Sequence, residues 1–233
     1  MELNKIHWAK QDIKPFLGYL KSLSKGEDKA LWEQKIANTK MPCLAIPSKK
    51  IDEITKQIFK GNYIEFLDLW IFENLSCTLI IAKLISKIKD FSVFCFYLEK
   101  FADQIDNWAS CDTIKFNIKN NEKNFLNLSK SFIKSKKVFK RRVGIRICFK
   151  FCDEKNISKV FDIIKSLKCE QEYYVNMAIS WLMCDAFIKC RKQTLDFLKE
   201  NNLNNFCLNK MISKCQDSFR ISKEDKLMLK SFK

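Results

Sequence analysis

Glycine and proline are scarce in this chain, and their scarcity restricts the fold more than any other feature. The 233 residues include four glycines and three prolines, where average usage would give roughly 16 and 12. Folds with many tight turns, such as β-sandwiches and barrels, need far more of both. Gly18, Gly26, Gly61 and Gly144 also lie too far apart to form a glycine-rich phosphate-binding loop. The chain is therefore predicted to be all-α.

Apolar residues recur at helical spacing along nearly the whole chain. They predict a first helix that carries Ile6, Ile13 and Leu20, and a second that carries Trp32 and ends before Pro42. A third helix is expected to start after an N-cap at Ser48. Further helices are expected at residues 63–72, 75–88 and 91–105, and from residue 108 onward, with Asn, Asp and Ser clusters between them.

Short helices joined by short loops, in pairs of roughly 35–45 residues, are typical of α-solenoids of the HEAT type. We therefore expect a single domain over residues 1–233, built as an α–α superhelix of HEAT-like repeats. No clean internal repeat stands out in the sequence, so a compact helical bundle remains an alternative.

The charge balance is strongly basic. Lys and Arg total 43 against 27 Asp and Glu, a net charge of +16. An excess of this size indicates a polyanionic partner, such as nucleic acid or an acidic membrane surface. Codon bias is an alternative source of the lysines, because Asn, Ile and Phe are also abundant.

The basic residues are concentrated in one segment. Residues 123–152 contain ten basic residues and no Asp or Glu. Several follow one another at helical steps of three and four: Lys130, Lys134, Lys137 and Arg141, with Arg142 and Arg146 as a second pair. Cations spread in this way suit a DNA phosphate backbone, because each contact releases a counterion. A lysine-rich face that only meets solvent is the alternative.

The eleven cysteines do not resemble a disulfide framework, because their number is odd and the N-terminus has no apolar signal segment. No Cys-x-x-Cys pair occurs, His7 is the only histidine, and Cys148 and Cys152 lack further ligands. We expect no metal, no cofactor and reduced thiols in a cytoplasmic protein. Uncharged runs such as 173–184 are too short to cross a membrane.

Residues 107–112 hold the most specific pattern. Trp108 and Asp112 stand four residues apart and would share one face of a helix. Alone the pair is weak evidence, since a helical tryptophan usually lies in the core and an aspartate is usually solvated. Two later segments add to it: residues 138–145 place arginines at the start of an apolar helix, and residues 173–181 end in a second tryptophan.

The order of these segments resembles the AlkD-type family of DNA alkylation-repair glycosylases. Its members show a Trp-x-x-x-Asp helix, then an aromatic-x-x-Arg helix start, then two aromatics followed by hydrophobic-x-x-Ala-Ile-x-Trp. In this chain Trp108 and Asp112 match the first segment, Phe139 and Arg142 match the second, and residues 173–181 match the third. The resemblance covers the chain from about residue 40, so the helices of residues 1–40 lie outside it.

The resemblance implies a role for each matching residue. Asp112 would be the catalytic carboxylate, Trp108 and Trp181 the active-site tryptophans, and Arg142 a DNA-backbone contact. The basic segment supplies further candidate DNA-binding residues: Arg141, Arg146, Lys134 and Lys137. The partner would be double-stranded DNA with alkylated bases, bound by a monomer, in the nucleoid if the source is a bacterium.

Three departures from the family pattern bear on substrate range. Ala109 stands where members often have Asp, and Phe139 where they commonly have Trp. A family tyrosine near the end of the second helix has no clear counterpart, since Ile36 lies nearby and Trp32 is one turn earlier.

The residue types suit the implied chemistry. An N3- or N7-alkylated purine is cationic and leaves readily, so a carboxylate that stabilises the oxocarbenium character of the sugar is the main requirement. His7 is the only histidine, which argues against a His-based general base or triad. Two other functions remain open: a non-catalytic relative that binds bent or branched DNA, and a helical scaffold for protein partners.

Overall fold

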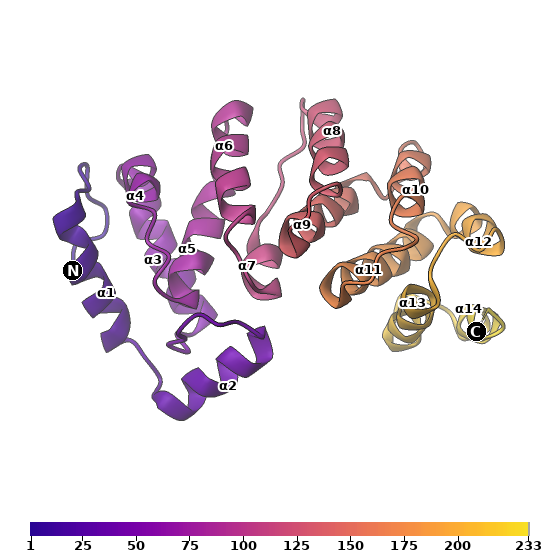
Figure 1. Cartoon of the computed structure of the whole chain (residues 1–233), viewed down its shortest axis with the longest axis horizontal. Helices are drawn as coiled ribbons and strands as arrows, with labels where there is room; N and C mark the ends of the chain where they lie inside the picture. The colour runs from indigo at the N-terminus through magenta and orange to yellow at the C-terminus, as the bar shows by residue number, and fades with distance from the viewer. Residues whose placement is uncertain (233) are drawn as a thin grey trace. The chain divides into compact units, whose positions relative to one another are not determined.

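The computed structural model describes residues 1–232, and over these residues the chain is all-α. Fourteen α-helices hold 66% of the residues, and the described part contains no β-strand. This confirms the predicted fold class. The helices form two compact units, Met1–Asn117 and a second that begins at Ile118; Figure 1 labels them along the chain.

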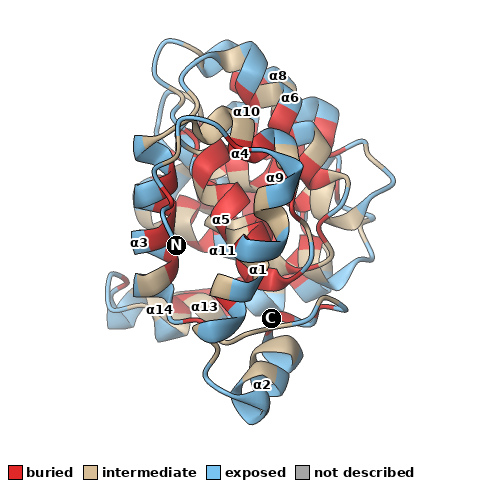
Figure 2. Cartoon of the chain, turned by 90° about the vertical axis from the view of Figure 1, so that its left-hand side faces the viewer, coloured by how far each residue is buried: buried red, intermediate tan, exposed pale blue. Residues whose placement is uncertain are grey.

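The first unit is organised around one apolar helix. Its elements are a 3-10 turn η1 (Lys10–Asp12) and helices α1 (Ile13–Ser22), α2 (Glu27–Ala37), α3 (Ser48–Lys60), α4 (Tyr63–Leu69), α5 (Leu75–Ile85), α6 (Phe91–Ala102) and α7 (Trp108–Thr113). Helix α5 is buried along nearly its whole length (Figure 2). It packs against α3 and α7. Helices α4 and α6 also pack against α5. Alternate helices therefore form a row, as in helical repeats.

The second unit repeats this alternation. Its elements are α8 (Glu122–Phe132), α9 (Val138–Cys148), a 3-10 turn η2 (Phe149–Phe151), α10 (Ile157–Lys165), α11 (Tyr173–Lys189), α12 (Arg191–Lys199), α13 (Asn205–Asp217) and α14 (Lys223–Lys230). Helices α9, α11 and α13 form the row, and α8, α12 and α14 each pack against one member of it. Within each unit the packing is that of an α-helical solenoid.

Polar caps begin many of the helices, at the joints that the sequence predicts. In each, a side-chain oxygen accepts the backbone N–H three residues later; the caps are Asn62, Asn74, Asp90, Asn107, Asn204 and Ser222. Such a cap stabilises a helix by about 1 kcal/mol. The predicted cap at Ser48 is wrong: Pro47 is the N-cap and Ser48 is the first helical residue, because the carbonyl of Pro47 accepts the N–H groups of Lys50 and Ile51.

The N-terminal segment also differs from its prediction. Helix α1 begins at Ile13, so Ile6 lies outside it, at a bend in the N-terminal segment. There the carbonyl of Lys5 accepts the N–H of Asn62, and a Cβ on Gly61 would lie 2.2 Å from that carbonyl oxygen. Gly61 is therefore required for the close approach of the two segments.

Helix α2 presents its apolar residues to solvent rather than to the core. Leu31, Trp32 and Ile36 are 58%, 67% and 45% exposed, and Ala37 is the buried residue of this helix. Figure 2 shows α2 almost entirely in the exposed and intermediate colours. The apolar spacing predicts the helix correctly but not the environment of its side chains.

The cysteines are free thiols, and most of them fill core positions. All eleven lack a disulfide partner and eight are buried. Cys148 is fully buried, donates to the carbonyl of Gly144 and lies 3.2 Å from the Ser129 hydroxyl. Within residues 1–232, no group of three or more His, Cys, Asp or Glu could hold a metal ion, and no helix is long and apolar enough to cross a membrane.

Candidate functional site

Helix α7, which carries Trp108 and Asp112, is fixed in the first unit by buried polar contacts. Asn107 is fully buried and caps the helix by accepting the N–H of Ser110 at 2.8 Å. The hydroxyl of Ser110 lies 2.7 Å from that of Thr78 on α5. A buried hydrogen-bonded pair of this kind costs free energy to separate, so α7 has a defined position on α5.

Asp106, just before α7, ties this helix to the chain that leaves α2. Its carboxylate accepts hydrogen bonds from the Thr39 hydroxyl at 2.6 Å, the Lys40 N–H at 2.8 Å and the Asn107 amide at 3.0 Å. Burial opposes ionisation of this carboxyl, but the hydrogen bonds outweigh it and lower the pKa of Asp106. The carboxylate form therefore holds α2 and α7 together at neutral pH.

Trp108 forms a direct link between the same two helices. Its indole Nε1 donates to the carbonyl of Ile36 on α2, with 3.0 Å between nitrogen and oxygen. The side chain is partly exposed, so Trp108 is not a core tryptophan. The bond fixes the ring at a surface, as a binding residue requires.

Trp108 and Asp112 share one cleft of about 350 Å³ in the first unit. Its walls come from α2, α3, α5 and α7, and they include Trp32, Glu33, Ile36, Leu79, Lys83, Trp108 and Asp112. Asp112 is half-buried and makes a contact of its own within the structure. The structure thus brings together the two motif residues that the sequence places four apart, beside further apolar and charged side chains.

Sequence reasoning assigned no role to three residues of this cleft. Trp32 gives it a second indole, Glu33 a second carboxylate, and Lys83 an ammonium group that is 2.8 Å from Asp52. Glu33 accepts the N–H of Ala45 at 2.8 Å, which fixes the loop after α2. The only available signal was the position of Trp32, one turn before the place of the missing family tyrosine.

In the second unit, Arg141 is paired with an acid. Its guanidinium donates to both oxygens of Glu170, at 2.7 and 3.0 Å, and to the carbonyls of Ser135 and Lys136. The side chains are 13% and 6% exposed. Burial opposes ionisation of Glu170, but bonds from Arg141 and from two backbone N–H groups prevail and lower the pKa of Glu170. The Arg141 charge is therefore balanced within the fold.

Arg142 is buried as well, with 4% of its surface exposed. Its Nη1 donates to the carbonyl of Tyr174 at 2.5 Å, which links α9 to α11. Its aromatic neighbour in the motif, Phe139, packs on the ring of Tyr174, 5.4 Å between centroids. The small residue of the motif has a packing role, since a Cβ on Gly144 would lie 3.0 Å from Ile133 of the α8–α9 turn. The structure places Arg142 at a helix junction.

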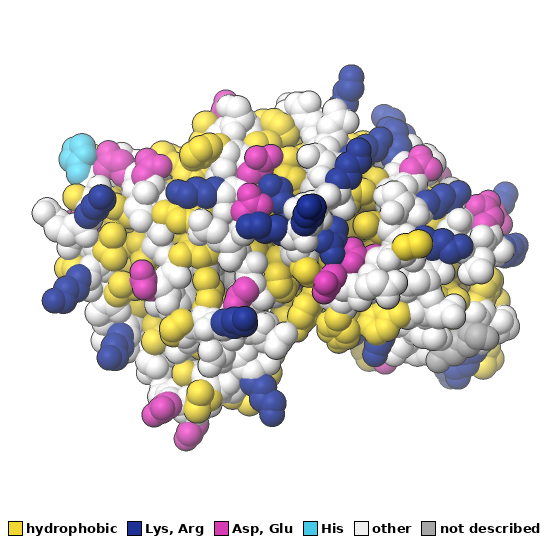
Figure 3. Space-filling model, in the orientation of Figure 1, with side chains coloured by type: hydrophobic (Ala, Val, Ile, Leu, Met, Phe, Trp, Pro, Cys, Tyr) yellow, Lys and Arg dark blue, Asp and Glu magenta, His cyan; other side chains and the backbone are white. Residues whose placement is uncertain are grey.

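Lys134 and Lys137 do not continue the helix of Lys130. They lie in the turn between α8 and α9, where both are exposed, and Lys137 is the N-cap residue of α9. Arg146, on α9, lies with its guanidinium carbon 4.7 Å from the ring centre of Phe149. Figure 3 shows Lys and Arg side chains interspersed with Asp and Glu over the face it presents, rather than a continuous basic patch.

Trp181 lies on α11 at the edge of a separate hollow of about 300 Å³ in the second unit. It is 39% exposed, and the Lys214 ammonium lies 4.9 Å from the centre of its ring. Asp185, one helical turn later, lines the same hollow and pairs with Lys189 at 2.7 Å. The face of the Trp181 indole therefore already attracts a cation.

The fold and these side chains define an all-α helical-repeat protein with an acidic, aromatic cleft. A model of the family described as DNA alkylation repair enzyme matches residues 19–213, and the chain belongs to this family. The match confirms the family resemblance and extends it before residue 40, to all of α2 and the end of α1. Comparison with curated proteins gave no significant match. Membership assigns the protein to DNA alkylation repair and implies that it binds DNA.

Proposed function

We propose that this protein is a DNA glycosylase that hydrolyses the N-glycosidic bond of cationic N3- or N7-alkylpurines in duplex DNA. The observation that carries the proposal is the cleft of the first unit, which the half-buried Asp112 lines together with two indoles, Trp32 and Trp108. The protein would act as a monomer on DNA in the cytoplasm. Residues 1–233 would form one DNA-binding domain.

The reaction needs little beyond a fixed negative charge. Alkylation at N3 or N7 makes the purine a good leaving group, and positive charge develops on the deoxyribose as the bond breaks. A carboxylate held near C1′ stabilises that charge and orients the attacking water. Asp112 has this role in our proposal, because α7 is fixed by the contacts of Asn107 and Ser110.

The indoles would bind the charged lesion and sugar. An indole face attracts a cation by about 0.5–2 kcal/mol, more when water is excluded. Trp108 and Trp32 present aromatic surface in the cleft of Asp112, and the ring of Trp181 already has the Lys214 ammonium against it. We assign the DNA-backbone contacts to Arg146, Lys134 and Lys137. Arg142 and Arg141 would support this surface from within the fold, through the Tyr174 carbonyl and the Glu170 carboxylate.

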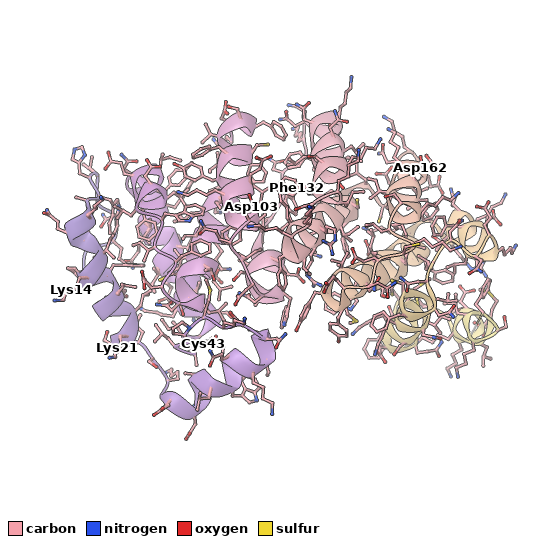
Figure 4. All side chains as sticks on the ribbon, in the orientation of Figure 1. Lys14, Lys21, Cys43, Asp103, Phe132 and Asp162 are labelled. Carbon is pink, nitrogen blue, oxygen red and sulfur yellow. The ribbon has the colours of Figure 1, made fainter. Side chains whose placement is uncertain are left out.

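The test is release of the base from duplex DNA that contains N7-methylguanine, followed by chromatography under single-turnover conditions. Asp112→Asn should bind this duplex nearly as well as the wild type, but excise the base about 10- to 1,000-fold more slowly. Asp103→Asn is the matched control in the same unit (Figure 4). It lies outside the cleft and should leave the rate unchanged.

Two outcomes would contradict the proposal. Equal rates for Asp112→Asn and the wild type would remove Asp112 from the reaction. A wild type that binds the duplex tightly but releases no base would favour the alternative, a non-catalytic relative that recognises bent or branched DNA.

A further inference from the structure

A second hollow of the first unit lies beside the cleft of Asp112. It has a volume of about 480 Å³ and is lined by α3, by the end of α5 and by the residues that close α7. Lys83 and Thr113 line both the hollow and the cleft. We call it the lysine hollow, because its wall contains Lys56, Lys83, Lys87 and Lys115.

The charge of this wall is strongly unbalanced. Four ammonium groups face one acid, Asp52, and that acid is 63% exposed and paired with Lys83 at 2.8 Å. Lys56, Lys87 and Lys115 are exposed. Gathering like charges around one hollow costs free energy, and the cost is removed when an anion binds there. The arrangement therefore indicates an anionic ligand.

The hydroxyl groups of the wall cannot supply hydrogens to that ligand. Thr55, Ser86 and Thr113 each donate their single hydroxyl hydrogen to a carbonyl of their own helix, at 2.7–2.8 Å. Ser86 also accepts the N–H of Lys115 at 2.9 Å. The remaining donors are lysine ammonium groups. These are flexible point charges that suit phosphate oxygens.

We propose that the lysine hollow binds backbone phosphates of the DNA duplex next to the lesion, through Lys56, Lys87 and Lys115. The inference rests on the proposed function for its choice of duplex DNA as the anion. Because Lys83 and Thr113 border both sites, phosphates bound here would hold the neighbouring nucleotide at the cleft of Asp112. The site lies in the first unit, outside the basic segment 123–152.

The test is the salt dependence of duplex binding by the full chain, measured by fluorescence anisotropy with an unmodified 20-base-pair duplex. The triple variant Lys56→Gln, Lys87→Gln, Lys115→Gln should lower the slope of log K against log salt by about 2–3 units, at about 0.9 per phosphate contact. Affinity at 0.1 M salt should fall on the order of 100-fold. Asp52→Asn should raise affinity.

The control has the same change in net charge within the same unit. Lys10, Lys14 and Lys21 are exposed and lie outside the hollow, on η1 and α1; Figure 4 labels the last two. Replacing all three with Gln should change the slope by less than about one unit. An equal loss in the control, or an unchanged slope in the test variant, would overturn the proposal. Circular dichroism should show native helix content in both.

Excision measurements separate this proposal from the proposed function. The test variant should need a higher DNA concentration than the wild type for half-maximal release of N7-methylguanine, since its lysines act through duplex binding. A wild type that shows the lysine-dependent slope but releases no base would sustain the phosphate site and refute the glycosylase. Normal excision with an unchanged slope would sustain the glycosylase and refute the phosphate site.

Discussion

The pair of Arg141 and Glu170 offers a test of what the basic helix α9 does. We consider Arg141→Met, Glu170→Gln and the double variant. Two guanidinium–carboxylate bonds, at 2.7 and 3.0 Å, join side chains that are 13% and 6% exposed. Each charged bond contributes about 1.5 kcal/mol or more. Either single variant should therefore lower the free energy of unfolding by about 3 kcal/mol, the scale for losing one partner of a buried pair.

The pair should also make stability depend on pH. The pKa of Glu170 is lowered in the folded state, so its contribution is fully present above the unfolded pKa of about 4.3. The contribution is lost as pH falls through the lower, folded pKa. Urea unfolding, followed by circular dichroism from neutral to acid pH, should show a flatter acid limb for Glu170→Gln than for the wild type.

A double-mutant cycle and a duplex-binding measurement complete the test. The double variant should lower the free energy of unfolding by less than the sum of the two single variants, with a coupling free energy of about 2–3 kcal/mol. Arg141→Met should change duplex affinity little, because the charge it removes is already balanced by Glu170. If Arg141→Met instead weakens DNA binding more than tenfold while stability is unchanged, Arg141 contacts phosphate in the complex and our reasoning is refuted.

Three further predictions concern single positions. Trp32→Ala should slow excision of N7-methylguanine about tenfold, by loss of an indole face. Leu31→Ala, at the neighbouring residue outside the cleft, should match the wild type. Equal rates for both variants would exclude Trp32 from the site. Gly61→Ala should lower the free energy of unfolding by about 1–3 kcal/mol, since its Cβ would overlap the Lys5 carbonyl; unchanged urea unfolding would show that the segment shifts freely. Ellman's reagent should react fastest with Cys169, the exposed thiol. A chelator should leave the melting temperature unchanged, and stoichiometric zinc in the protein would contradict that expectation.

Much of the fold could be predicted from the sequence, because helical periodicity and the scarcity of Gly and Pro are local properties. The caps at Asn74 and Asn107 follow from side-chain chemistry alone. Helix ends were less predictable: α4 stops at Leu69 because Trp70 adopts a left-handed conformation, with φ at 50°. Nothing in the residue type of Trp70 favours that conformation.

The candidate site was predictable only in part. The four-residue spacing of Trp108 and Asp112 indicated a shared face, and the structure places both in one cleft. The sequence could not show that Arg142 is buried against Tyr174, because a run of basic residues carries no information about ion pairs and burial. Nor could it place Trp32 beside Trp108, since that depends on how α2 meets α7.

Helix α2 gives the cleft an adjustable wall. Ala37 is its buried residue, and the contacts that join it to α7 are polar: the Trp108–Ile36 hydrogen bond and the bonds of Asp106 to Thr39 and Lys40. A helix held by so few contacts opens at a much smaller free energy than the core helices. Its amide hydrogens should exchange with solvent well before those of α5. If the cleft binds the alkylated base as we propose, the largest alkyl group that it admits would depend on how often α2 moves aside, rather than on the width of the closed cleft.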